Sequence, residues 1–100
     1  MPFSQLIPQA LTPVMIYAQA PTASGVYGIS NAREWIYIGE TDNIRGALLA
    51  HLQDSGAPVM QRQPTGFVFE VCEQSKRPAR QDRLVLEYEP TCNRHGTRGQ

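Results

Sequence analysis

The sequence has no excess of charge of either sign. Nine Lys and Arg residues balance nine Asp and Glu residues, so the net charge gives the chain no general attraction to nucleic acid or to an anionic membrane. Long apolar runs are also absent, because no segment approaches the ~18 apolar residues that a membrane-spanning helix needs. These absences argue against a highly basic DNA-coating protein and against a protein embedded in a bilayer.

Cysteine is scarce, and its spacing excludes two further classes. Cys72 and Cys92 stand alone, with no C-x-x-C pair, so the sequence indicates neither a zinc site nor a disulfide framework. A reducing compartment fits such a chain, and we expect the protein to be cytoplasmic. Internal repeats and low-complexity tracts are absent too. With hydrophobic residues at 41% of the chain, we expect one small globular domain with a modest core.

The first 23 residues form a weakly patterned lead-in that is rich in Pro, Gln and Ala. Its one strand-like run is Val14 to Tyr17. The segment contains an Ala-Gln-Ala that faintly resembles a signal-peptide cleavage site, but it lacks a basic start and is interrupted by Pro8 and Pro13. We predict that residues 1–23 stay in the mature protein and pack on the domain that follows.

Residues 24–93 carry the patterns of an α+β domain, and residues 94–100 form a basic tail. Alternating apolar residues predict strands, and apolar residues spaced by three or four predict helices. The predicted elements are a hairpin over residues 24–30 and 34–40, a helix within 41–56 capped by Thr41 or Asp42, a third strand over 66–73 and a helix over 75–90. The fold class is therefore a small three-stranded antiparallel sheet flanked by helices.

Two similar tripeptides lie on the predicted hairpin, Gly25-Val26-Tyr27 and Tyr37-Ile38-Gly39. His51 follows near the end of the first predicted helix, and a Pro-x-x-Asn pattern at residues 90–93 closes the domain. Together these features resemble the signature of the GIY-YIG nuclease superfamily, and the resemblance covers most of the chain. Alternate side chains of adjacent strands point to one face, so we expect the phenols of Tyr27 and Tyr37 to share one patch.

The resemblance implies a mechanism and a set of roles. In the family, a helix Glu and the target phosphate hold one divalent metal, Mg²⁺ or Mn²⁺, that assists phosphodiester hydrolysis. The resemblance implies that Tyr27 activates water with the help of Tyr37 or His51, and that an Arg on the first helix stabilises phosphate charge. A hard cation needs a carboxylate, and the developing charge needs a cation. DNA is the implied partner.

Two positions depart from the family pattern. Counting forward from Gly39 places Ala47 where the family has its Arg, and counting back from Pro90 and Asn93 places Gln81 where the family has its Glu. Gln81 offers a neutral amide oxygen, which is a weak ligand for Mg²⁺ or Mn²⁺. The resemblance therefore implies a site that has lost both a charge stabiliser and a metal ligand.

Four further residues complete the candidate site. Arg45 is the arginine nearest to Ala47, but two positions on a helix rotate a side chain by about 200°, so it serves only if the helix start is irregular or its long side chain wraps back. Gly39 leaves room at the helix N-terminus, whose N–H groups favour an anion. Asn93 and Arg80 are the other candidate phosphate contacts. An alternative role for Asn93 is to tie down the C-terminal chain.

Three functions remain open from the sequence. The first is a nuclease-superfamily domain with impaired or absent catalysis that binds nucleic acid or a protein partner, as Ala47 and Gln81 suggest. The second is an active divalent-metal-dependent endonuclease in DNA repair, recombination or restriction, supported by Tyr27, Tyr37 and His51. The third is a protein–protein module without phosphate affinity.

Overall fold

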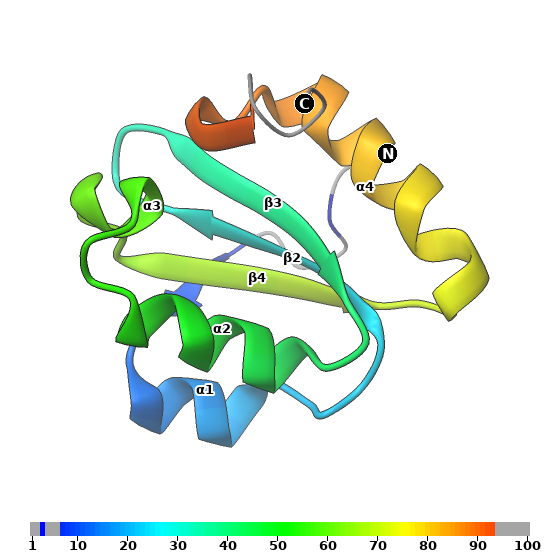
Figure 1. The fold of residues 1–100 in the computed structure, drawn as a ribbon, viewed down its shortest axis with the longest axis horizontal. Helices are drawn as coiled ribbons and strands as arrows, with labels where there is room; N and C mark the ends of the chain where they lie inside the picture. The colour runs from blue at the N-terminus through cyan, green and yellow to red at the C-terminus, as the bar shows by residue number, and fades with distance from the viewer. Residues whose placement is uncertain (1–2, 4–6, 94–100) are drawn as a thin grey trace.

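The computed structural model describes Phe3 and residues 7–93, so the predicted basic tail lies outside the described residues. A four-stranded antiparallel sheet with the order β1-β4-β2-β3 forms its centre (Figure 1). The strands are β1 (Gln9–Ala10), β2 (Gly25–Ser30), β3 (Trp35–Thr41) and β4 (Gly66–Val71). The α+β class and the three predicted strands are confirmed, but the count of three was wrong. The fourth strand, β1, comes from the lead-in and pairs with β4.

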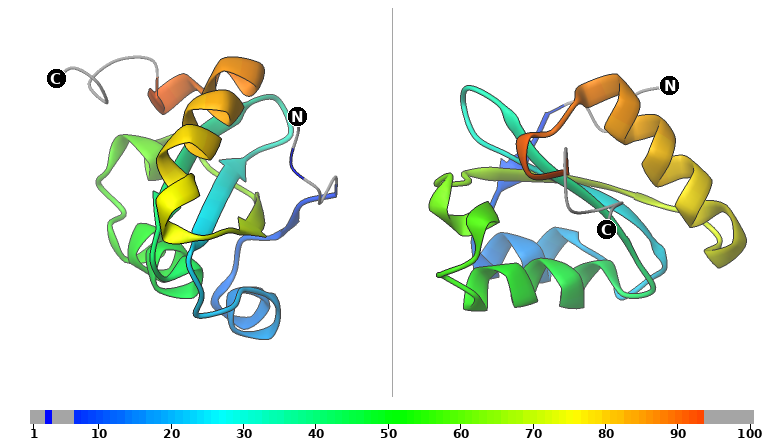
Figure 2. Two further views of the ribbon diagram at one scale, coloured as in Figure 1. Left: turned by 90° about the vertical axis from the view of Figure 1, so that its right-hand side faces the viewer. Right: turned by 45° about the horizontal axis from the view of Figure 1, so that its top comes forward.

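Helices cover both faces of the sheet. They are α1 (Pro13–Gln19), α2 (Ile44–Gln53), α3 (Pro58–Gln61) and α4 (Arg77–Tyr88), with 3₁₀ turns η1 (Gln74–Lys76) and η2 (Thr91–Asn93). Two views agree that α1 and α2 lie side by side on one face and α4 on the other (Figures 1 and 2). In the described part of the chain, none of these helices combines the length and the apolar character that crossing a bilayer requires.

The run from Val14 to Tyr17 is helical, so the expectation of a strand there was wrong. The helix α1 begins at Pro13, which suits the first turn because a proline lacks the N–H that would be unpaired there. Thr12 caps it by accepting a hydrogen bond from the Met15 N–H at 3.2 Å. Ile16 is fully buried, so local capping and one buried side chain outweigh the strand preference of the run.

The first predicted helix is α2, and its cap differs from both predicted caps. Asn43 precedes the helix, and its side-chain oxygen accepts a hydrogen bond from the Gly46 N–H at 3.1 Å. Thr41 instead accepts a hydrogen bond from the Asn43 N–H at 3.0 Å. Within the predicted loop after α2, the short helix α3 starts at Pro58.

Two apolar clusters pack against the two faces of the sheet. Every residue of β2 is buried, because β2 lies between two strands and is covered by helices on both sides. Its side chains alternate between the clusters. Large members are Ile29, Leu48 and Phe67 on the α2 side and Val26, Val68 and Leu84 on the α4 side.

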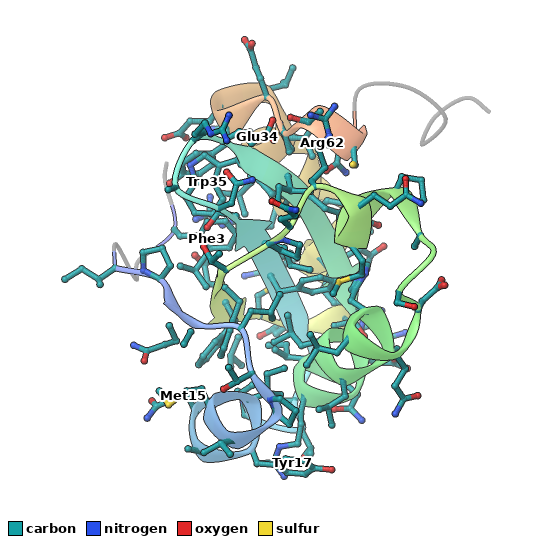
Figure 3. The ribbon with its side chains drawn as sticks, turned by 90° about the vertical axis from the view of Figure 1, so that its left-hand side faces the viewer. Phe3, Met15, Tyr17, Glu34, Trp35 and Arg62 are labelled. Atoms are coloured by element: carbon teal, nitrogen blue, oxygen red, sulfur yellow. The ribbon has the colours of Figure 1, made fainter. Side chains whose placement is uncertain are left out.

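A β-bulge in β3 changes which face its side chains reach. Ser30 pairs with Trp35 and Ile29 with Tyr37, so Ile36 is an extra residue in β3. Trp35 packs on the α4 side, with its ring centroid 6.1 Å from that of Phe3 and 4.7 Å from that of Tyr88 (Figure 3). Trp35 therefore packs against the sheet.

The helix α4 ends in a left-handed residue. Glu89 has φ 50° and ψ 57°, and its N–H donates to the carbonyl oxygen of Val85 at 2.8 Å. Pro90 follows and cannot continue the helix, as the sequence predicted. A side chain with a Cβ carries a conformational cost at this position.

Replacing Glu89 with glycine should stabilise the fold. The left-handed conformation costs a residue with a Cβ about 1–2 kcal/mol, and the larger folding entropy loss of glycine offsets part of this, so we expect a gain of about 0.5–1 kcal/mol. Urea denaturation measures the free energy of unfolding. The matched control is Glu89→Ala, which removes the carboxylate but keeps the Cβ and should give no such gain. Equal gains from both variants would contradict the backbone explanation.

Candidate functional site

One cluster between the sheet and α2 contains Tyr27, Tyr37 and His51. The Tyr27 hydroxyl lies 2.9 Å from His51 Nε2, within hydrogen-bond distance. The ring centroids of Tyr27 and Tyr37 are 6.1 Å apart, and those of Tyr37 and His51 are 5.4 Å apart. Tyr27 pairs with Gly39 and Tyr37 with Ile29, which makes the tyrosines diagonal neighbours on one face. The structure therefore brings together the three residues at the centre of the predicted site.

The glycines of both tripeptides are required by close approaches. Gly39 lies opposite Tyr27, and a Cβ at Gly39 would lie 2.7 Å from Cζ and Oη of Tyr27 and 2.8 Å from Cε2 of Tyr37. A Cβ at Gly25 would overlap the carbonyl oxygen of Glu70 on β4. Gly39 thus makes room for the tyrosine rings, and Gly25 lets β2 and β4 approach.

The N-terminus of α2 is already satisfied by the protein. The N–H groups of residues 44–46 donate to the carbonyl oxygens of Ala23 and Pro21, both at 3.0 Å, and to the side chain of Asn43 at 3.1 Å. These are the donors that the sequence analysis assigned to an anion beside Gly39. Because they are used within the fold, the structure does not support phosphate binding at this helix end.

Arg45 points away from the tyrosine cluster. Its Nε donates to the Ala20 carbonyl oxygen at 2.9 Å, and an Nη donates to the Tyr17 carbonyl oxygen at 3.2 Å. The guanidinium carbon lies 5.5 Å from the centroid of the Tyr17 ring. Arg45 therefore binds the carbonyl end of α1, where a positive charge is favourable. Its side chain therefore does not wrap back toward Ala47, and it does not take the place of an arginine there.

Gln81 and Asn93 both bind the backbone of Ile38 at the outer edge of β3. Asn93 accepts a hydrogen bond from the Ile38 N–H at 2.7 Å and donates to the Ile38 carbonyl oxygen at 2.9 Å. Gln81 Nε2 donates to the same oxygen at 3.0 Å. Asn93 is buried. These contacts fit the alternative role of Asn93, which is to hold the C-terminal chain in place, better than a role in binding phosphate.

Arg80 forms an ion pair within the fold. Its Nε and an Nη lie 2.7 and 2.8 Å from the two carboxylate oxygens of Glu70, which joins α4 to β4. Arg77, one turn earlier, has its Nε 3.0 Å from Glu40 on β3. The basic start of α4 is therefore largely engaged with carboxylates of the sheet.

Comparisons with known proteins identify the fold of the chain. No family model matches the chain, and no curated protein matches it either. Among solved structures, the GIY-YIG N-terminal endonuclease domain of UvrC from Thermotoga maritima, bound to its catalytic magnesium, superposes with a TM-score of 0.65. That match covers 77% of this chain and 93% of the other, at 22% identity. The chain has the GIY-YIG nuclease fold.

Variants of the same UvrC domain match equally well. A tyrosine-to-phenylalanine mutant bound to the catalytic divalent cation gives a TM-score of 0.64 at 20% identity, and an asparagine-to-alanine mutant gives 0.65 at 22%. Each match covers 77% of this chain and 92% of the other. At such identities the similarity establishes the fold, and the chemistry of this chain has to be argued from its own residues.

The cluster of Tyr27, Tyr37 and His51 is uncharged near neutral pH. Burial, and secondly Tyr37, raises the pKa of the Tyr27 phenol far above its usual value. Burial, followed by Cys92 and Glu40, also raises the pKa of Tyr37. Burial lowers the pKa of His51 below its usual 6.5, and Asp54 opposes this only in part. A neutral imidazole beside a protonated phenol can pass a proton but does not supply a phenolate.

The residues present do not fit a divalent metal. In the part of the chain that the structure describes, no group of three or more His, Cys, Asp and Glu side chains is placed to hold one. Gln81 stands at the position of the family Glu, and its amide nitrogen is bound to Ile38. Mg²⁺ in proteins is usually held through one or two carboxylates, and among the described residues position 81 offers only an amide oxygen.

A pocket of about 310 Å³ opens beside the cluster, and the sequence analysis missed it. It is lined by Tyr27 and by four residues of α2 and its cap, which are Ala47, Ala50, His51 and Asp54. These four follow the helical spacing i, i+3, i+4, i+7, so a helical projection of the sequence would have grouped them. Ala47 faces this pocket beside His51, which agrees with the position that the family pattern gave it.

Replacing Gly39 with alanine should destabilise the fold. The added methyl group would press on both tyrosine rings, and such overpacking costs about 1–3 kcal/mol. The free energy of unfolding in urea measures this cost. The matched control is Gly56→Ala, because a Cβ there meets no atom within 4 Å. A Gly39→Ala variant as stable as the control would contradict the packing role of Gly39.

Stability should fall as the pH drops below about 6.5, through His51. Its pKa is lowered in the folded state, so the unfolded state takes up the proton first and the contribution to stability present above pH 6.5 is lost on acidification. Urea denaturation at pH 7.5 and 5.5 measures the loss, which should be smaller in His51→Gln. Equal losses in the two proteins would contradict this assignment.

Proposed function

We propose that this GIY-YIG domain does not hydrolyse phosphodiesters and acts by binding nucleic acid or a protein partner. The observation that carries the proposal is the state of residue 81, where the position of the family Glu is occupied by an amide that donates to the backbone carbonyl oxygen of Ile38. A hydrolase that depends on Mg²⁺ or Mn²⁺ loses its Lewis acid with this ligand.

The absence of an arginine at position 47 supports the same conclusion. Ala47 lines the pocket beside His51, and Arg45 is engaged by the carbonyl groups of α1. Removing one preorganised charge stabiliser typically slows a reaction by about 10²–10³-fold. The loss of both the cation and the metal ligand supports a domain without turnover.

An active metal-dependent endonuclease is the second candidate, and one observation favours it. The Tyr27 hydroxyl lies within hydrogen-bond distance of His51 Nε2, and Tyr37 packs beside both. The residues that would transfer a proton are therefore in contact with one another. The UvrC domain of the same fold is an endonuclease with a catalytic divalent cation. On this alternative, Mg²⁺ or Mn²⁺ is required and DNA is the substrate.

The ion pairs of α4 are relevant to whether the partner is nucleic acid or a protein. Arg77 is close to Glu40, and Arg80 is bound to Glu70, so α4 presents less free positive charge than the sequence suggests. A basic face usually dominates affinity for DNA. The pairing supports a partner that does not depend on such a face. We also infer a cytoplasmic location, because Cys72 and Cys92 are free thiols.

The test is a cleavage assay on plasmid and branched DNA with Mg²⁺ or Mn²⁺. We expect no cleavage by the wild-type chain. The double variant Ala47→Arg, Gln81→Glu restores the two missing groups, and Asn93 still binds Ile38 in it, so the sheet edge should hold. We expect this variant to cut if the rest of the site is competent.

Adding Tyr27→Phe to the double variant is the control, since cleavage by the site should then be lost. A gel-shift assay on the same samples reads binding separately from cleavage. Metal-dependent cutting by the wild-type chain that Tyr27→Phe abolishes would contradict the proposal and establish the endonuclease alternative.

A further inference from the structure

The lining of the pocket beside Tyr27 carries a net negative charge. One wall is the stripe of Ala47, Ala50, His51 and Asp54, and Tyr27 faces it from β2. Asp54 supplies the only formal charge of this lining, and no Lys or Arg contributes to it. The two alanines leave the space open, since their side chains end at Cβ.

The other polar groups of the pocket do not offset this charge. Burial keeps the Tyr27 phenol protonated and lowers the pKa of His51, so the imidazole is neutral near pH 7. The nearby C-terminal end of α2 adds partial negative charge through its last carbonyl groups. Among the residues that the structure describes, Asp54 forms no ion pair.

A phosphate would fit this environment poorly. It would bring a second negative charge next to Asp54 with no cation in the lining to compensate, and like charges at short range repel each other. A cationic group would instead meet the Asp54 carboxylate and the uncharged side chains of His51 and Tyr27, so the lining offers it an opposite charge and no like charge. The volume of the pocket, about 310 Å³, lies at the small end of the range of ligand pockets, which is about 300–1,000 Å³.

We propose that the pocket formed by Tyr27, Ala47, Ala50, His51 and Asp54 binds one organic cation, a guanidinium or an alkylammonium group. This inference rests on the proposed function, because it assigns a ligand to the site that the domain would use for binding. The chemistry is shared by an arginine or lysine side chain of a protein partner and by a free polyamine.

Binding is measured by NMR on the ¹⁵N-labelled full chain. Methylguanidinium and butylammonium chloride are the cationic probes, and inorganic phosphate at equal ionic strength is the anionic one. We expect saturable shifts of the amide signals of residues 47–54 with the cations, with dissociation constants in the millimolar range expected for so few atoms. We expect no saturable shift there with phosphate.

Two variants test the pocket itself. Asp54→Asn removes the charge and should weaken methylguanidinium binding at least fivefold, while Asp42→Asn removes an exposed carboxylate elsewhere and should leave it unchanged. Ala47→Arg should abolish binding, because its own guanidinium would fill the space. Tighter binding of phosphate than of the cations, or equal methylguanidinium affinity in Asp54→Asn and wild type, would overturn the inference.

Two larger probes identify the source of the cation. Tighter binding of the peptide Gly-Arg-Gly than of spermidine supports a protein partner, and the reverse order supports a free polyamine. Either result supports the cation site. Cleavage of DNA by the wild-type chain would refute the proposed function without changing these affinities, and absence of cation binding would refute this inference without restoring cleavage.

Discussion

The outer edge of β3 depends on the side chain of Asn93, which supplies Ile38 with one donor and one acceptor. An exposed sheet edge presents unpaired N–H and C=O groups, and a neighbouring strand would normally satisfy them. Asn93 does this with a single amide from η2, and Gln81 adds a second donor from α4. The C-terminal part of the domain is thereby held against the same strand that carries Tyr37.

This arrangement explains how residue 81 can serve stability in place of chemistry. A carboxylate at this position could not donate to the Ile38 carbonyl oxygen, whereas the amide of Gln81 does so at 3.0 Å. The acidic residues of the neighbouring elements are likewise used as structural partners, Glu40 by Arg77 and Glu70 by Arg80. These two ion pairs thus join α4 to β3 and to β4.

Much of the fold could be predicted from the sequence, because the hairpin, α2, β4 and α4 each carry a clear local pattern. The short strand β1 could not, since two residues gain their structure only by pairing with β4. Val14 to Tyr17 has strand-like side chains, but the Thr12 cap and Pro13 decide the outcome. In such short segments, capping and tertiary pairing outweigh propensity.

The candidate site divides in the same way. The strand alternation and the family resemblance placed Tyr27, Tyr37 and His51 together. The partners of Arg45 and Gln81 could not be predicted, because both bind backbone carbonyl groups, which leave no trace in the identity of the partner residues. Asp54 was missed because it belongs to no motif, although its helical spacing from Ala47 was visible.

The lead-in also has a practical meaning for work on the isolated fold. Phe3 is 1% exposed, packs against the rings of Trp35 and Tyr88, and donates its N–H to the Tyr88 hydroxyl, while β1 covers the start of β4. A fragment trimmed to the motif-bearing residues would therefore expose aromatic surface on one face and an open strand at the other edge. Both features promote self-association, so the unit suited to crystallisation or screening starts well before the first tripeptide.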